Sequence, residues 1–244
     1  MSEKKELNYF AYDPKFKLSD RFTIRTRADY EKQFESAAGF PVIGEASPAY
    51  FSESGAAARI HRLIPKIKLI TSLRNPVERA YSAYLMQLRM GRTNLKVHQA
   101  FSPDQHWVKL GFYSDSLTRF YSLFPKSNIR VVLQEDLSKD SAKVMKTLFA
   151  YLEVEENFHP DVQTRHNVGT RPKLQPLQRA VRLRKSRRWP IPSYLKNALR
   201  RIEKFNQSPP DPMPESRRED LKKLYRDDIQ RVQTIIDRDL SDWL

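Results

Sequence analysis

An arginine and a serine near the middle of the sequence are spaced so that both can hold one anion. Arg74 follows residues 67–73, an apolar run typical of a strand, and Pro76 opens a helical pattern that includes Ser82. The last residue of such a strand lies at the carboxyl edge of a sheet, where open α/β folds bind ligands. A guanidinium, a hydroxyl and a helix start all suit a phosphate. Alternatively, Arg74 pairs with a carboxylate and Ser82 only packs.

Strand and helix patterns alternate up to about residue 155. Short apolar runs predict the strands, and apolar residues recurring every three or four positions predict the helices. The predicted strands are residues 41–45, 67–73 and 129–133, and the predicted helices are residues 56–63, a helix from Pro76, and helices within 113–124 and 141–152. This order predicts an α/β fold with a parallel sheet flanked by helices. We expect one domain over residues 1–244, with an α/β core in 1–164 and a helical C-terminal part in 165–244.

Composition limits the classes of function. The 244 residues carry a formal net charge of +15, which favours anionic partners, and the absence of cysteine excludes disulfides, thiolate nucleophiles and cysteine-based metal sites. The five histidines show no metal-ligand spacing, so we expect no metal. There is no apolar run of membrane-spanning length and no signal peptide at the polar start. We therefore expect a cytoplasmic protein.

The basic charge is concentrated in residues 165–204, which include a run of arginine and lysine at 182–188. A proline-rich linker at 209–214 and an amphipathic terminal helix over 221–236 follow. Residues 177–205 mix basic and apolar side chains, so the chain could instead be a basic protein that contacts an anionic membrane surface or nucleic acid. Polyanion affinity that is indifferent to nucleotide would favour this alternative.

Residues 73–86, LRNPVERAYSAYLM, resemble the 3′-phosphate-binding motif of sulfotransferases that use 3′-phosphoadenosine-5′-phosphosulfate (PAPS). The similarity is greatest to the heparan-sulfate-type enzymes and their bacterial relatives. Further segments resemble that family in the same order, so the resemblance spans nearly the whole chain. These segments are residues 5–10, 44–51, 111–113, 135–137, 165–167 and 239–244.

The resemblance implies a P-loop-NTPase-like fold and transfer of the sulfuryl group from PAPS to a hydroxyl of a carbohydrate-like acceptor, with no metal and no specific nucleic acid. It implies that Glu6 is the general base, that Arg74 and Ser82 hold the 3′-phosphate, and that Arg171 and Tyr113 approach the nucleotide. Read without the resemblance, Glu6 is a solvated charge, Arg171 a surface arginine and Tyr113 a core aromatic residue.

One part of the family pattern is missing from the sequence as given. Relatives begin with a strand and a glycine-rich loop that binds the 5′-phosphosulfate, whereas none of the six glycines here lies in such a pattern. We expect that the first strand and this loop are absent. The open explanations are a misassigned start, a truncated gene, or an inactive relative that binds nucleotide, polyanion or a membrane surface.

Overall fold

The computed structural model describes residues 1–12, 23–155, 170–186, 201–202 and 205–244, and the side chains of residues 181–186 are not described. The chain forms two compact units, each assembled from separate stretches of sequence. The first unit contains Met1–Arg74, Tyr113–Val162 and Val232–Arg238, and the second contains Asn75–Phe112, Gln163–Arg231 and Asp239–Leu244. The prediction of a single domain remains a prediction.

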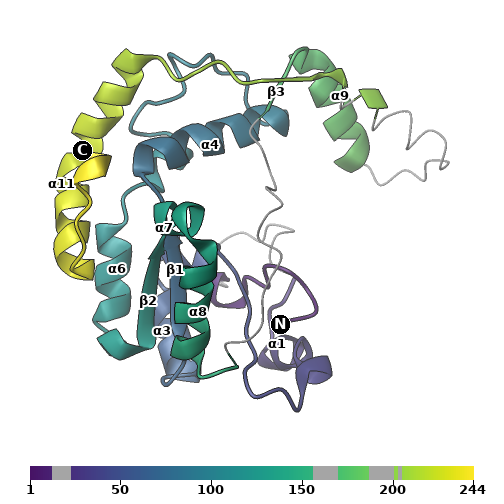
Figure 1. The fold of residues 1–244 in the computed structure, drawn as a ribbon. Coiled ribbons are helices and arrows are strands. Elements are labelled where there is room, and N and C mark those ends of the chain that lie inside the picture. The colour runs from purple at the N-terminus through teal and green to yellow at the C-terminus, as the bar shows by residue number, and fades with distance from the viewer. Residues whose placement is uncertain (13–22, 156–169, 187–200, 203–204) are drawn as a thin grey trace. The chain divides into compact units, whose positions relative to one another are not determined.

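The first unit is built on two parallel strands. Strands β1 (Leu69–Leu73) and β2 (Ile129–Leu133) pair in register from Leu69 opposite Ile129 to Leu73 opposite Leu133. Helices α6 and α8 run alongside the strands (Figure 1). The helices of this unit are η1 (Tyr9–Ala11), α1 (Arg27–Lys32), η2 (Glu35–Ala37), α2 (Ala49–Ser52), α3 (Ala56–Leu63), α6 (Ser114–Tyr121), η3 (Lys126–Asn128), α7 (Gln134–Lys139) and α8 (Ser141–Leu152).

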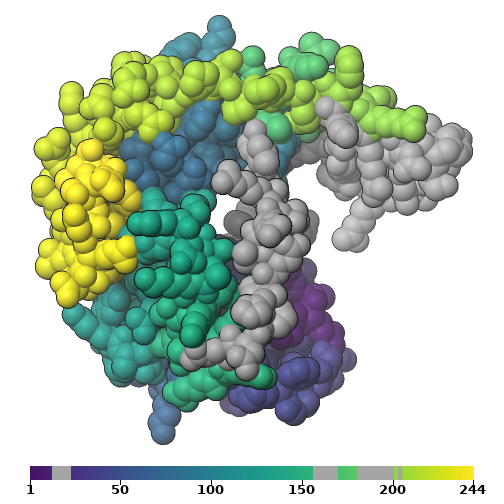
Figure 2. Space-filling view, in the orientation of Figure 1, coloured from purple at the N-terminus to yellow at the C-terminus, as the bar shows by residue number. Residues whose placement is uncertain are grey.

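Aromatic and aliphatic side chains from η1, α1, α3, α6 and β2 form the core of this unit. Phe10 stacks edge-on against Tyr30 at 5.1 Å between ring centroids, and Phe120 lies 6.2 Å from Phe124. Helix α8 contributes no fully buried residue, and part of the α7 and α8 surface faces the viewer in Figure 2. Because Phe10 belongs to this core, the N-terminal segment is part of it.

The second unit is mainly helical. Helix α4 contacts both α5 and β3, and the Gln178 side chain donates a hydrogen bond to the Arg89 carbonyl. Strands β3 and β4 form a short antiparallel pair. The elements are α4 (Pro76–Arg89), α5 (His106–Lys109), β3 (Arg171–Pro172), α9 (Gln175–Ser186), β4 (Gln207–Ser208), α11 (Glu215–Ile236, up to Arg231 in this unit) and η4 (Ser241–Trp243).

The structure confirms the α/β class with a parallel sheet and flanking helices. The predicted strand at residues 41–45 is wrong, because this segment lacks ladder pairing and its Gly44 carbonyl accepts a bond from the Ser2 amide instead. Val42 and Ile43 are exposed. Residues 209–214 form no helix, as predicted, and α11 begins directly after them. Residues 165–167, and residues 187–200 of the basic region, lie outside the described residues.

Candidate active site

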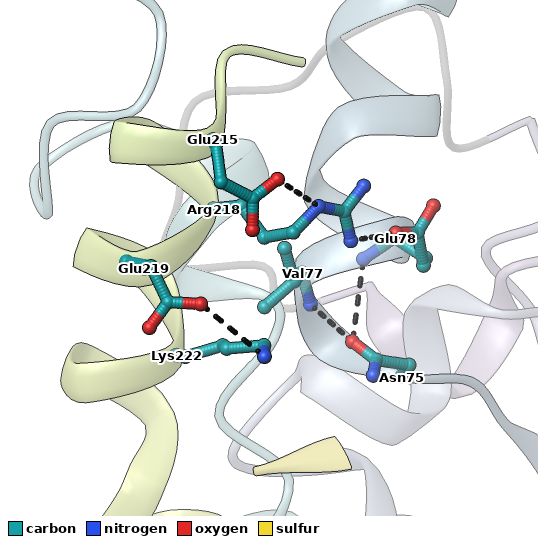
Figure 3. Close-up of polar contacts among 7 residues, drawn as sticks. All are labelled: Asn75, Val77, Glu78, Glu215, Arg218, Glu219 and Lys222. Atoms are coloured by element: carbon teal, nitrogen blue, oxygen red, sulfur yellow. Dashed lines mark hydrogen bonds and ion pairs between the residues drawn. The ribbon is translucent and has the colours of Figure 1, made fainter. Parts of the chain in front are cut away.

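The predicted strand, turn and helix around Arg74 are present. Strand β1 ends at Leu73, and α4 begins at Pro76, a proline in the first helical turn. Asn75 caps the helix, since its Oδ1 accepts hydrogen bonds from the amides of Val77 at 3.0 Å and Glu78 at 3.4 Å (Figure 3). Because these two amides are already bonded, an anion at this turn would depend on side chains for most of its contacts.

Arg74 and Tyr113 are brought together in the first unit. The Tyr113 hydroxyl donates a hydrogen bond of 2.9 Å to the Arg74 carbonyl. Tyr113 is buried at the N-terminal boundary of α6, and its ring lies 6.1 Å from that of Phe51. Arg74 itself is half-buried. The contact fixes the backbone of the residue that carries the predicted phosphate-binding guanidinium.

Ser82 lies on α4 in the second unit, one helical turn after Glu78, and is exposed. The Glu78 carboxylate forms an ion pair with the guanidinium of Arg218 from α11, whose Nε lies 3.8 Å from Glu215 (Figure 3). Lys222 pairs with Glu219 on the same helix at 3.3 Å. Arg218 thus offsets a negative charge beside the predicted position of a phosphate. Sequence reasoning missed Arg218, because no local pattern links it to Glu78.

Arg171 has protein partners in the second unit. Its guanidinium pairs with Asp211, and the Asp211 carbonyl accepts a hydrogen bond from the Tyr81 hydroxyl. The Arg171 carbonyl accepts a bond of 3.3 Å from the Ser208 hydroxyl. These contacts attach the proline-rich linker to α4 and β3. The predicted approach of Arg171 to the nucleotide remains a prediction.

Glu6 is exposed in the N-terminal segment and has a positive φ of 57°. Its carbonyl accepts a hydrogen bond of 2.9 Å from the side-chain amide of Asn8. The Asn8 backbone amide in turn donates to the Ser47 hydroxyl at 3.1 Å. The structure therefore joins two segments that the sequence offered as separate motifs, residues 5–10 and 44–51.

One open pocket of the first unit, about 440 Å³ in volume, contains none of the predicted site residues. It lies among β2, α7 and α8, and its rim includes the ion pair of Arg238 and Asp136 at 2.7 Å. Among the residues that the structure describes, no group of three or more histidine, aspartate or glutamate side chains is arranged to hold a metal ion. No helix in the described ranges is both long enough and apolar enough to cross a bilayer.

Part of the chain matches a known protein family. A family model for the sulfotransferase domain matches residues 58–167, a range that contains Arg74, Ser82 and Tyr113. Residues 58–167 are therefore similar to the sulfotransferase domain. A solved sulfotransferase from Alicyclobacillus acidocaldarius superposes on 99% of this chain and 87% of its own with a TM-score of 0.70 and 24% identity. This likeness shows that the chain shares its fold with the bacterial protein.

Curated proteins similar to this chain include human heparan sulfate glucosamine 3-O-sulfotransferase 6. That protein is 32% identical over 131 residues, which cover 50% of this chain and 38% of the human protein. Human bifunctional heparan sulfate N-deacetylase/N-sulfotransferase 2 is 28% identical over 131 residues, covering 48% of this chain and 15% of the relative. The match therefore spans less than two fifths of the length of either relative.

Proposed function

We propose that this chain transfers the sulfuryl group from PAPS to a hydroxyl of a carbohydrate-like acceptor. The observation that carries the proposal is the turn after β1, where Arg74 is held by Tyr113 immediately before the capped start of α4. The resemblance of residues 73–86 to the 3′-phosphate motif supports PAPS as the donor. The named activities of the heparan sulfate relatives support a sugar acceptor.

In the proposed complex, Arg74 and Ser82 bind the 3′-phosphate of the nucleotide. A guanidinium offers two parallel N–H donors to phosphate oxygens, and the exposed Ser82 hydroxyl adds a third donor. Arg218 neutralises Glu78, so the carboxylate one turn from Ser82 does not repel the phosphate. Tyr113 acts on this site through the Arg74 backbone. Arg171 is proposed to approach the nucleotide in addition to holding Asp211.

The transfer step needs a base, because an alcohol is a poor nucleophile at neutral pH. We assign this role to the Glu6 carboxylate, which is exposed. The acceptor oxygen forms a bond to sulfur, the bond between sulfur and the bridging phosphate oxygen breaks, and the proton of the acceptor passes to Glu6. The products are the sulfated acceptor and 3′-phosphoadenosine 5′-phosphate. Positioning and stabilisation of the leaving phosphate supply the rest of the catalysis.

The test is transfer of ³⁵S from labelled PAPS to desulfated heparan sulfate, comparing Glu6→Gln with Glu3→Gln. Glu3 is a matched control because it is also exposed and lies three residues away. We expect Glu6→Gln to lower kcat by about 100-fold or more, in the range of a lost general base. Glu3→Gln should leave the rate unchanged. Equal rates in the unmodified chain, Glu6→Gln and Glu3→Gln would refute the role of Glu6. Absence of transfer by the unmodified chain would refute the proposed reaction.

A further inference from the structure

Glu6 and Asn8 both have left-handed backbone conformations. Their φ angles are 57° and 54°, and only four non-glycine residues of the described chain have a positive φ. Each such residue carries a conformational cost of about 1–3 kcal/mol and persists only when its surroundings enforce it. The contacts around Asn8 should therefore explain why the backbone at Glu6 is held in this form.

Asn8 is buried, with 4% of its surface exposed, and it makes two hydrogen bonds that constrain the segment. Its side-chain amide donates to the Glu6 carbonyl at 2.9 Å, and its backbone amide donates to the Ser47 hydroxyl at 3.1 Å. Leu7, between the two left-handed residues, is 2% exposed and belongs to the core cluster. The segment is thus anchored at Leu7 and Asn8 while Glu6 faces solvent.

The Ser47 hydroxyl accepts from Asn8 because its own proton is used elsewhere. It donates to Oε2 of Glu45 at 2.7 Å, and the Tyr50 hydroxyl donates to Oε1 of the same carboxylate at 2.9 Å. A hydroxyl has one proton, so donation to Glu45 leaves the Ser47 oxygen as the acceptor for the Asn8 amide. Both oxygens of Glu45 accept, which a glutamine cannot reproduce because its amide nitrogen only donates.

The tyrosine partner of Glu45 stays protonated at neutral pH. Burial, together with the charge of Glu45, raises the pKa of Tyr50 well above its ordinary value, and the same causes raise the pKa of Tyr30. The Tyr50 hydroxyl therefore remains a donor to Glu45. The hydrogen bonds converge on Glu45, because Tyr50 and Ser47 both donate to its carboxylate and Asn8 donates to Ser47. Each proton of the network is thus assigned to one bond.

We infer that Glu45 is a positioning residue, which holds the general base Glu6 in place through Ser47 and Asn8. This inference rests on the proposed function, because Glu6 needs a fixed position only if it accepts the acceptor's proton. Backbone motion around a general base on an exposed segment lowers the rate of proton transfer, because the transfer requires a hydrogen-bond distance of about 2.6–3.2 Å. The Glu45 carboxylate contributes by fixing which partner Ser47 donates to.

The experiment compares Ser47→Ala, Ser47→Thr and Glu45→Gln in the full chain, with Ser52→Ala as the matched control. Ser52 is an exposed serine of the neighbouring helix α2, whose hydroxyl bonds only locally to the Ala49 carbonyl at 3.4 Å. The two readouts are hydrogen exchange of the Asn8 amide by NMR and ³⁵S transfer from PAPS to desulfated heparan sulfate. The first readout requires no activity.

We expect Ser47→Ala to speed exchange of the Asn8 amide at least tenfold and to lower kcat about tenfold, with the KM for PAPS within twofold. Glu45→Gln should change both in the same direction, Ser47→Thr should restore both because it keeps the hydroxyl, and Ser52→Ala should change neither. Unchanged Asn8 exchange in Ser47→Ala and Glu45→Gln would overturn the inference. Loss of activity through global unfolding, or a rise in KM as large as the fall in kcat, would also overturn it. A merely structural role predicts either result.

Failure of the inference and failure of the proposed function give different results. If the unmodified chain transfers no sulfate but the variants exchange the Asn8 amide faster, the hydrogen bonds are supported and the proposed reaction is refuted. The positioning role is then refuted with the reaction. Transfer by the unmodified chain that is insensitive to both variants would uphold the reaction and overturn the role of Glu45.

Discussion

The Tyr113 hydroxyl donates a hydrogen bond of 2.9 Å to the backbone carbonyl of Arg74, which links the start of α6 to the residue that follows β1. The side chain of Arg74 is the predicted phosphate ligand, and its backbone has a buried partner. The position of the guanidinium therefore depends on a residue 39 positions away in sequence.

Replacing Tyr113 by phenylalanine should weaken nucleotide binding and stability together. The Arg74 carbonyl loses this partner, which should lower the free energy of unfolding by about 1 kcal/mol. Affinity for 3′-phosphoadenosine 5′-phosphate should fall about threefold, as measured by calorimetry. Tyr121→Phe on the same helix is the control, and equal effects of the two variants would contradict the role of Tyr113.

Replacing Arg218 by alanine should weaken the same affinity through charge. The variant leaves the Glu78 carboxylate without this ion pair, one turn from Ser82, and the added repulsion should cost about fivefold in affinity, on the order of 1 kcal/mol. The double variant Arg218→Ala with Glu78→Gln keeps the wild-type net charge and should recover most of the loss. Equal weakening in the single and double variants would show that Arg218 acts by another route.

Stability should decline at alkaline pH through Tyr84. Burial raises the pKa of Tyr84 to about 12, and its hydroxyl donates to the Leu95 carbonyl at 2.7 Å. The unfolded chain releases this proton near its ordinary value of about 10, so this contribution is complete below about pH 10 and is lost as the pH rises toward 12. Urea unfolding at pH 9, 10 and 11 should show a shallower decline in Tyr84→Phe. Identical slopes would contradict the assignment.

Replacing Gly111 by alanine should destabilise the second unit. A Cβ at Gly111 would lie 2.7 Å from the ring of Tyr225, which is fully buried and bonded to the Val108 carbonyl. Overpacking of this kind costs about 1–3 kcal/mol, measurable by urea denaturation. At Gly44 the nearest atom is 4.0 Å away, so Gly44→Ala should be nearly neutral. A neutral Gly111→Ala would mean that Tyr225 moves aside freely.

Local patterns predicted most of the fold. Residues 129–133 and 141–152 form the predicted strand and helix, because apolar periodicity and capping are encoded within a few residues. The prediction of a strand at residues 41–45 was wrong for the opposite reason. A strand exists only with a partner, and apolar side chains in an extended segment do not reveal whether one is available.

The site was predictable in part. The positions of Arg74 and Ser82 follow from strand, turn and helix chemistry and from the family resemblance of residues 73–86. The contacts of Tyr113 with Arg74 and of Arg218 with Glu78 join residues far apart in sequence, and no spacing rule indicates them. The same holds for Glu45, whose link to Glu6 passes through two other residues.

The most direct test of the nucleotide site is calorimetric titration of the chain with 3′-phosphoadenosine 5′-phosphate, beside Arg74→Ala and Arg62→Ala. Arg62 is an exposed arginine of α3 and controls for the loss of one positive charge. We predict saturable binding that Arg74→Ala weakens at least tenfold and Arg62→Ala leaves within twofold, as expected for a lost charged hydrogen bond of about 1.5–3 kcal/mol. Absence of binding by the folded chain, or equal weakening in both variants, would contradict a 3′-phosphate site at Arg74.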